Sequence, residues 1–559
     1  MSDIAPAGTA SARTGPADLV LTGGQVHTGS PARSRATSVA VRGERIVAVG
    51  HDEVRELIGP RTEVVDLAGK LLIPSFQDAH VHPVGGGMEL GQCDLSGATT
   101  LAAYRERIAA YARRNPRLEW ITGGGWAMEA FPGGLPSVAE LDAVVPDRPV
   151  YLVNRDHHGA WVNSEALRRA GIDARTPDPG DGRIERDASG APTGMLQEGA
   201  ANLVGGLLPP ATREERIAGL LRAQELLHSL GVTAWQDALL GTHANLTDPT
   251  DAYLACADDG RLTARVVGAL WWDRARGTEQ IEELCARRAA GTRGRLRSTT
   301  VKIMQDGVAE NGTAALLGPY LDGCGCRTDN SGISFVPPDD LRRHVTALDA
   351  HGFQVHFHAL GDRAVREALD AVEAARRANG WSDTRPHLAH LQVVHPDDIG
   401  RFRALGASAN IQPLWAAHEP QMDELTIPFL GAERTARQYP FAALLRSGAT
   451  LAAGSDWPVS SPDPVQGIHV AVNRVAPDAP AGTPVFLPGQ RIGLLDALTA
   501  YTAGSAYVNG LDAETGAIAP GFLADLVVLD RDPFAGPPEE IGAARVAQTF
   551  VGGRRVFGG

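Results

Sequence analysis

The sequence predicts an α/β protein, and three observations support this fold class. Through the middle of the chain, short apolar runs alternate with stretches of helical periodicity, which is typical of a parallel sheet covered by helices. Both ends of the chain instead carry short runs rich in Val, Ile and Leu, which indicate strands. The chain has 559 residues, whereas a simple α/β barrel needs about 250. We therefore expect a large α/β unit, a smaller β domain and an insertion.

The elements of the α/β unit follow from local patterns. Helical periodicity is clearest in three segments, each of which ends at a glycine: 214–231, 363–380 and 397–406. Strand-like apolar runs lie before or after them, at 232–238, 301–307, 353–362, 386–394 and 449–458. This alternation predicts parallel strands with helices on the outside.

The two β-rich ends are expected to form one composite domain, because the segment between them then begins and ends at neighbouring points. We assign residues 18–74 and 515–559 to this domain, and residues 75–514 to the α/β unit. Residues 95–215 are rich in Gly and Pro and precede the first clear helix–strand unit, so they are the expected inserted subdomain. Residues 1–17 are expected to form a flexible arm.

Composition and charge exclude several classes of protein. The formal net charge is −14 and the basic residues form no cluster, which argues against nucleic-acid binding. No apolar stretch reaches the roughly 18 residues of a membrane helix, and the N-terminus lacks the apolar run of a signal peptide. Five cysteines are too few for a disulfide scaffold. We therefore expect a cytoplasmic protein with neither a nucleic-acid nor a membrane partner.

Four strand-like runs end in side chains that bind metal ions. His80 and His82 are separated by one residue, so on a strand both project from the same face. The other three runs contribute further candidates: His356, His358, His387, His390 and Asp456. Because catalytic groups of α/β barrels gather at the carboxyl ends of the strands, the four runs together predict a metal centre.

The chain contains only two lysines, Lys70 and Lys302, among its 52 Lys and Arg residues. Strand alternation directs Val301 and Ile303 toward the outer helices and Lys302 into the barrel, where an unpaired ammonium is costly to bury. One interpretation is that the side chain extends to the mouth of the barrel. The other is that an amine of lowered pKa reacts with carbon dioxide to form a carbamate, an anionic ligand that bridges two metal ions. Arginine keeps its proton and forms no such ligand.

Five segments, in this order, resemble the metal-dependent amidohydrolase superfamily: PSFQDAHVHP, VKIMQDG, VHFHALGDRAV, HLAHLQVVHPDDIGRF and LAAGSDWPV. Within it they are similar to the branch of N-substituted formamide deformylases and YtcJ-like proteins. The resemblance implies a (β/α)8 TIM barrel with a composite β-sandwich built from both termini and a large insertion after strand 1. The branch usually has Pro-Gly-Phe before its first histidine pair, and here Ser75 replaces the glycine.

The resemblance also implies a divalent metal centre, with zinc as the expected ion and two ions bridged by a carboxylated Lys302. Histidine and carboxylate ligands also accept manganese, iron or cobalt. The implied ligands are His80, His82, Lys302, His358, His390 and Asp456. His356 and His387 are second-choice ligands, expected to support the site instead.

Three segments of the insertion look like signatures of the same branch: 123–126, 156–164 and 194–198. They are expected to form the wall or lid of the substrate pocket. We single out His158 and Trp126 as candidate substrate contacts. The alternatives are a tryptophan in the core and a histidine that caps a helix.

The resulting hypothesis is hydrolysis of a non-peptide C–N bond, in an amide or an N-substituted formamide-like small molecule. A metal ion lowers the pKa of water toward 7 and polarises the carbonyl group. Asp456 is expected to accept a proton from that water and to return it to the departing nitrogen, acting as general base and then general acid. The candidate oligomeric state is a homodimer.

Two alternatives remain open at this point. The first is a mononuclear deaminase or cyclic-amide hydrolase on the same barrel. Deaminases of this superfamily carry His-X-X-Glu after the fifth strand, whereas here Ala359, Leu360, Gly361 and Asp362 follow His358, which disfavours that version. The second alternative is a non-catalytic regulatory protein on the same scaffold, against which the full ligand set argues.

Overall fold

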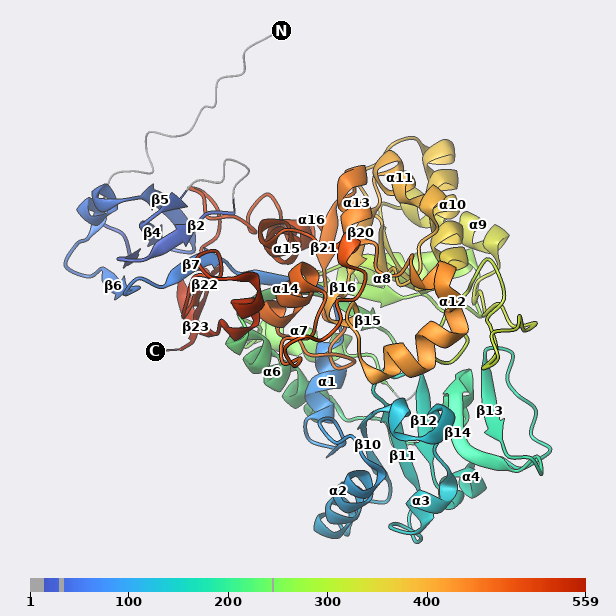
Figure 1. The fold of residues 1–559 in the computed structure, drawn as a ribbon. Helices are drawn as coiled ribbons and strands as arrows, with labels where there is room; N and C mark the ends of the chain where they lie inside the picture. Colours follow the sequence, from blue (N-terminus) through green and yellow to red (C-terminus); the bar gives the residue numbers. More distant parts are fainter. Residues whose placement is uncertain (1–14, 30–34, 244–245, 559) are drawn as a thin grey trace.

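The computed structural model describes residues 15–29, 35–243 and 246–558 (Figure 1). Of the predicted flexible arm, residues 1–14 lie outside the described residues. Ala17, at the end of that arm, is buried, and its backbone N–H donates a hydrogen bond to Leu57 O at 2.8 Å. None of the described helices is both long and apolar enough to cross a bilayer.

Eight parallel strands form the central sheet, and their order in space follows their order in the chain. They are β8 (Phe76–Val81), β15 (Val232–Leu240), β16 (Arg265–Trp271), β17 (Leu296–Met304), β18 (Gln354–Ala359), β19 (His387–His390), β20 (Ser408–Ile411) and β21 (Leu451–Ala453). Hydrogen bonds just beyond β21 join the last strand to the first: Asp456 N–H to His80 O at 2.8 Å, and His82 N–H to Trp457 O at 2.9 Å. The sheet is therefore nearly closed into a barrel, which confirms the predicted fold class.

The contact between β8 and the segment directly after β21 depends on Gly454. A Cβ atom at this position would lie 2.7 Å from both the backbone nitrogen and the Cβ of His80. Such a contact is far shorter than van der Waals distance, so only glycine allows the two strands to meet here.

Helices cover the outside of the barrel (Figure 1). They are α6 (Arg213–Ser229), α7 (Thr250–Asp258), α8 (Ile281–Ala290), α9 (Pro338–Ala350), α10 (Asp362–Asn379), α11 (Pro396–Leu405), α13 (Phe441–Ser447), α14 (Pro464–Asn473), α15 (Leu494–Thr499) and α16 (Ser505–Val508). Helix α12 (Ile427–Thr435) lies nearer the insertion, where Leu430 packs with Leu316 and Tyr320 of the segment between β17 and α9. The three helices predicted from periodicity are α6, α10 and α11. Helix α6 begins with a capping box between Thr212 and Glu215, and α11 ends at Gly406 in the left-handed conformation.

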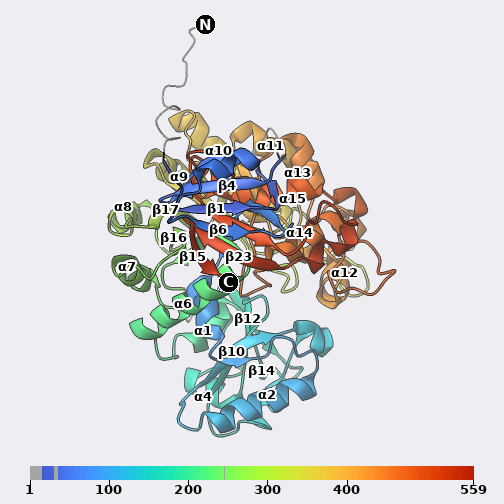
Figure 2. The ribbon, with the colours of Figure 1, turned by 90° about the vertical axis from the view of Figure 1, so that its left-hand side faces the viewer.

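Strands from both ends of the chain form two packed sheets beside the barrel. The first contains β1 (Leu19–Thr22), β4 (Ser38–Arg42), β5 (Arg45–Gly50) and β6 (Glu63–Asp66). The second contains β2 (Gln25–His27), β3 (Arg35–Ala36), β7 (Leu71–Pro74), β22 (Leu526–Leu529), β23 (Val546–Val551) and β24 (Arg554–Phe557). Figure 2 shows the blue N-terminal strands beside the red C-terminal ones. The pairing of β7 with β22 makes this sandwich a joint product of both ends.

Strand β7 connects this sandwich to the barrel. Its side chains alternate: Leu72 packs in the sandwich core, whereas Leu71 and Ile73 pack in the barrel core. The chain then continues directly into β8. Two hydrophobic cores therefore hold the start of the strand that carries His80.

The segment between β8 and β15 forms a third unit around its own six-stranded sheet, at the bottom of Figure 1. Its strands are β9 (Cys93–Asp94), β10 (Ile121–Trp126), β11 (Val150–Asn154), β12 (Gly159–Val162), β13 (Gly182–Arg186) and β14 (Pro192–Glu198). Its helices are α2 (Leu101–Arg114), α3 (Val138–Asp142), α4 (Ser164–Ala170) and α5 (Asn202–Gly205), and α1 (Pro83–Glu89) connects it to β8. This unit is the large insertion after the first barrel strand.

Candidate metal centre

A cavity of about 1290 Å³, counted with its open mouth, lies where the barrel strands end and the insertion begins. Its lining includes residues from seven barrel strands or the loops directly after them, together with the insertion. Seven of the residues predicted for the site are among them: His80, His82, His158, Lys302, His358, His390 and Asp456. The structure therefore brings every predicted metal ligand to one cavity.

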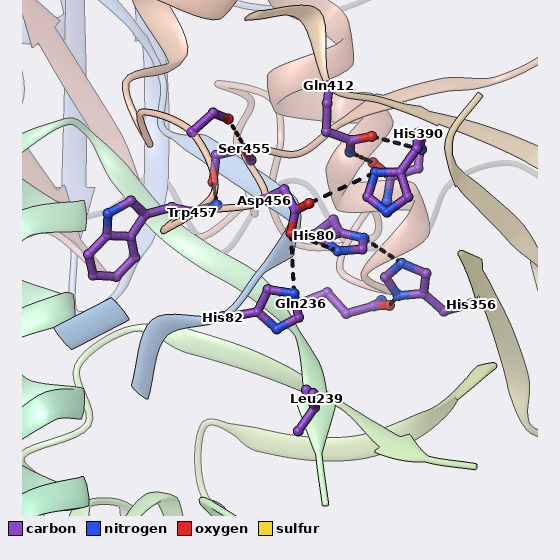
Figure 3. A network of polar contacts seen from close by, with 12 residues as sticks. His80, His82, Gln236, Leu239, His356, His390, Gln412, Ser455, Asp456 and Trp457 are labelled. Atoms are coloured by element: carbon purple, nitrogen blue, oxygen red, sulfur yellow. Dashed lines mark hydrogen bonds and ion pairs between the residues drawn. The ribbon is translucent and has the colours of Figure 1, made fainter. Parts of the chain in front are cut away.

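Asp456 lies at the centre of this group (Figure 3). Its Oδ1 is 3.1 Å from His80 Nε2 and 3.2 Å from His82 Nε2, and its Oδ2 is 4.0 Å from His390 Nδ1. Ligand atoms of His80, His390 and Asp456 all lie within 4.8 Å of one another. Burial, reinforced by Lys302, lowers the pKa of His80 to about 3. The imidazole is therefore neutral at neutral pH, as a metal ligand must be.

The backbone around the cavity holds conformations that are rare for residues with side chains. His157, Glu198, His390 and Asp456 have φ angles of 64°, 50°, 83° and 56°. Each such residue costs of order 1–3 kcal/mol and persists only where its surroundings enforce it, and such residues concentrate at functional sites. The chain thus keeps strained backbone where it presents the polar groups of this cavity.

Lys302 points into the barrel, as strand alternation predicts. Val301 and Ile303 pack in the hydrophobic core, whereas Lys302 lines the cavity and is 3% exposed. Burial lowers the pKa of its amine to about 7, against the opposing effect of Asp456. The Nζ atom has no hydrogen-bond partner among the described residues. A buried amine that is partly neutral at pH 7 is a nucleophile rather than a simple counter-ion.

His358 and His390 are held by side chains that the sequence reasoning did not select. Asp306 Oδ1 lies 3.3 Å from His358 Nδ1, and the same carboxyl group accepts backbone N–H bonds from three residues, Ala315, Leu360 and Gly361. Burial raises the pKa of Asp306 to about 7. Gln412 Oε1 accepts the backbone N–H of His390 at 2.8 Å.

A sequence signal existed for one of these side chains. Asp306 closely follows the run that contains Lys302, at a strand end where functional groups gather.

The two predicted substrate contacts differ in position. His158 lines the cavity, and its Nδ1 lies 3.0 Å from both oxygens of Glu198. Burial disfavours its charged form, but the carboxylates of Glu198, Asp156 and Asp456 together outweigh burial and raise the pKa of His158 to about 9. Trp126 is instead fully buried in the core of the insertion, packed on Phe131, and its indole N–H donates to Leu152 O at 2.9 Å. The structure therefore places Trp126 away from the cavity wall, because its ring fills the core under the sheet.

The donor set fits a divalent metal ion. Several buried polar atoms have no hydrogen-bond partner among the described residues: His82 Nδ1, Lys302 Nζ, both ring nitrogens of His390, and Asp456 Oδ1. An unsatisfied buried polar atom costs about 1–3 kcal/mol, so the cluster is incomplete as a purely hydrogen-bonded structure. Imidazole nitrogens and a carboxylate are ligands that Zn²⁺ and similar ions prefer.

Comparison with known proteins supports this interpretation. A profile described as the amidohydrolase family matches residues 63–557, which is most of the chain. The chain belongs to the amidohydrolase family. It is a metal-dependent hydrolase that acts on carbon–nitrogen bonds.

Three proteins illustrate the relationship of this amidohydrolase to others. It is 30% identical to the putative amidohydrolase YtcJ of Bacillus subtilis, covering 96% of this chain and 98% of the relative. It is 29% identical to an N-substituted formamide deformylase of Arthrobacter pascens, covering 96% and 97%. The crystal structure of an uncharacterized metal-dependent hydrolase from Pyrococcus furiosus is similar, with a TM-score of 0.69, 28% identity, and coverage of 92% and 99%. The predicted branch is confirmed.

A second cavity of about 970 Å³ adjoins the first in the amidohydrolase and shares His158, His358 and Asp456 with it. Trp415 and Tyr439 are among its other lining residues. The Trp415 ring stacks on His390 with a centroid separation of 5.2 Å. The cluster is thus accessible from two sides, and one of them has an aromatic wall.

Proposed function

We propose that this amidohydrolase cleaves a non-peptide C–N bond of a small molecule, in an amide or an N-substituted formamide. The observation that carries the proposal is the position of Asp456, whose Oδ1 lies within 3.2 Å of His80 and His82 in an open cavity. A carboxylate held there is within reach of a water molecule and of a substrate in the same space. The similarity to an N-substituted formamide deformylase supports the class of bond.

The ligands proposed for the metal are the side chains that converge on the cavity: His80, His82, Lys302, His358, His390 and Asp456. Zinc is the proposed ion, and a carboxylated Lys302 would supply anionic oxygen ligands to a centre of two ions. The neutral Lys302 amine adds to carbon dioxide and releases a proton, which produces the carbamate. When bound, the metal supplies Lewis acidity, which lowers the pKa of water and polarises a carbonyl oxygen.

The residues of the chain supply proton transfer and charge stabilisation. Asp456 accepts a proton from the attacking water and then delivers it to the nitrogen that leaves. His158, which Glu198 keeps protonated, donates a hydrogen bond to the carbonyl oxygen as negative charge develops there. The products are a carboxylate (formate for a formamide) and an amine. We place an apolar substituent of the substrate against Trp415 in the second cavity.

The proposal is tested by measuring metal content, the modification of Lys302 and hydrolysis of a panel of N-substituted amides and formamides. We expect about two ions per chain and a mass increase at Lys302 in the intact protein. One ion without the modification would favour the mononuclear alternative. A purified chain that binds no added zinc and hydrolyses none of the panel would overturn the proposal.

The variant Asp456→Asn separates proton transfer from binding. Asparagine keeps the shape and one oxygen ligand but accepts no proton, so we expect kcat to fall about 100- to 10,000-fold. Metal content, measured by elemental analysis, should change little. Unchanged turnover in this variant would contradict the role of Asp456.

A further inference from the structure

Behind His80, a chain of buried polar side chains crosses the interior of the barrel, and Figure 3 shows its first part. His80 Nδ1 lies 2.8 Å from His356 Nε2, and His356 Nδ1 lies 2.7 Å from Gln236 Oε1. Gln236 Oε1 is also 3.0 Å from His387 Nε2. His80, Gln236, His356 and His387 are each at most 1% exposed. Each hydrogen atom in this chain must therefore be shared between protein atoms.

The direction of these hydrogen bonds follows from backbone carbonyl groups at one end of the chain. Gln354 Nε2 donates to Arg385 O at 2.9 Å and to Val508 O at 2.8 Å. Carbonyl oxygens only accept, so the amide nitrogen of Gln354 must face them and its Oε1 must face the opposite way. That Oε1 accepts from Gln236 Nε2 at 3.1 Å. Gln236 therefore turns its own carbonyl oxygen toward the two histidines.

The other end of the chain leads independently to the same orientation. Asn410 Nδ2 donates to the carbonyl Ala79 O at 2.9 Å and also approaches His387 Nδ1 at 3.2 Å. His387 Nδ1 must then be an acceptor, so its proton is on Nε2. That N–H faces Gln236 Oε1, which must accept it. Two sets of backbone groups, far apart in the sequence, thus determine the same orientation of the Gln236 amide.

The orientation of Gln236 decides the protonation pattern of the next two rings. Because Gln236 Oε1 accepts, His356 carries its proton on Nδ1. His356 is fully buried, where a neutral imidazole costs less than a charged one, so its single proton on Nδ1 leaves Nε2 with only a lone pair. His80 must then donate to it from Nδ1. A neutral imidazole has one proton, which leaves His80 Nε2 bare on the side of Asp456.

We propose that Gln236, held by Gln354, is a positioning residue that sets the tautomer of His80 and so presents His80 Nε2 as a metal ligand. The inference rests on the proposed function, in which His80 binds the metal. Metal-bound histidines usually donate their second N–H to a carboxylate, a backbone carbonyl or water. Here that acceptor is a neutral imidazole, whose own tautomer is imposed by a glutamine.

His356 and Asp456 are competing acceptors for the single proton of His80. Asp456 Oδ1 lies 3.1 Å from His80 Nε2, and a carboxylate is a stronger acceptor than an imidazole. Without the hydrogen bonds that involve His356 and Gln236, the His80 proton would favour Nε2. There it would block the atom that is proposed to bind the metal. His80 Nδ1 nevertheless lies 2.8 Å from His356 Nε2, a shorter contact than the one between His80 Nε2 and Asp456 Oδ1. The shorter contact favours a proton on Nδ1, in agreement with the hydrogen-bond directions derived above.

The direct test uses the wild-type chain after metal removal by a chelator, with ¹⁵N-labelled histidine. Nitrogen chemical shifts distinguish a protonated ring nitrogen from a bare one, and the His80→Asn variant identifies the signals of His80. We expect the His80 proton on Nδ1, and a proton on Nε2 would overturn the inference. This measurement uses neither turnover nor bound metal, so the tautomer and the proposed reaction succeed or fail separately.

Three variants then measure the effect on zinc affinity, by competition with a chelating dye. Gln236→Met removes the acceptor at similar volume, and we expect zinc binding to weaken about 10- to 100-fold. Gln236→Glu, protonated in this buried position, offers the same acceptor and donor and should keep wild-type affinity. Thr300→Val is the matched control, because Thr300 Oγ1 only donates to Gln354 Oε1, at 2.7 Å. Equal affinity of Gln236→Met and wild type, or equal loss in all three variants, would contradict the inference.

Discussion

The mouth of the barrel and the core of the inserted sheet are both built from strands with little exposed surface, yet they bury different side chains. In the insertion, two large buried side chains find backbone partners: Trp126 donates to Leu152 O at 2.9 Å and Trp161 to Ser137 O at 2.8 Å. At the barrel mouth, Lys302 Nζ and both ring nitrogens of His390 have no hydrogen-bond partner among the described residues.

This difference separates a structural core from a functional one. A buried polar atom without a partner costs free energy, so folding alone favours the arrangement seen in the insertion. At the barrel mouth, several buried polar atoms lack a hydrogen-bond partner among the described residues, and several residues have strained φ angles. A bound metal ion or substrate supplies the missing partners, which is typical of a functional site. Substitutions at the barrel mouth should therefore change catalysis and metal binding, whereas substitutions in the core of the insertion should change stability.

The sharpest contrast is between the two lysines. In Lys302→Arg, a permanently charged guanidinium occupies a buried site and forms no carbamate, so we expect hydrolysis and the two-ion content to be lost. Lys70→Arg, on the link into the barrel, should keep both. Turnover and elemental analysis of the two variants decide the point, and an active Lys302→Arg enzyme would contradict the role of the carbamate.

The core of the insertion should respond through stability. Trp126→Ala leaves a cavity beside Phe131 and Trp161, and we expect the free energy of unfolding to fall by about 3–5 kcal/mol. Denaturant unfolding measures this loss, and zinc affinity of the folded variant should remain that of wild type. A large change in kcat/KM at unchanged stability would instead restore Trp126 as a substrate contact.

His158 should show the opposite behaviour. His158→Ala removes the proposed hydrogen-bond donor to the carbonyl oxygen, so we expect kcat to fall about 100- to 1,000-fold, as for loss of an oxyanion-hole donor. Its ring lies at the cavity wall, so the free energy of unfolding should change less than in Trp126→Ala. If KM rose while kcat stayed constant, His158 would bind substrate without stabilising the transition state.

The smallest effect is expected at Asp306, which contacts His358 rather than the substrate space. Asp306→Asn keeps an oxygen for some of the three backbone N–H groups but weakens the interaction with His358 Nδ1. We expect zinc affinity to fall about 10- to 100-fold. Competition with a chelator measures this change, and an unchanged dissociation constant would show that the backbone alone orients His358.

Much of the site was predictable because its signals are local. The run of residues 76–83 places two histidines on one face of a strand, and the same alternation directs Lys302 inward between Val301 and Ile303. Trp126 was not predictable in this way. A Gly-rich segment that ends in tryptophan has the same local pattern whether the ring faces a pocket or the core, and only the packing of β10 against Phe131 and Trp161 distinguishes the two.

The sequence by itself determined the fold class, the two-ended β domain and the set of candidate ligands. Periodicity and residue spacing can be recognised within short segments, without knowledge of the contacts between distant residues. Only the tertiary structure decided which atoms meet. His80 and His356 are 276 positions apart in the chain, and Gln236 is an inconspicuous amide in an apolar strand. Closure of the barrel places these side chains in one dry interior, where backbone carbonyl groups direct the hydrogen bonds and a distant glutamine determines which nitrogen of His80 is bare.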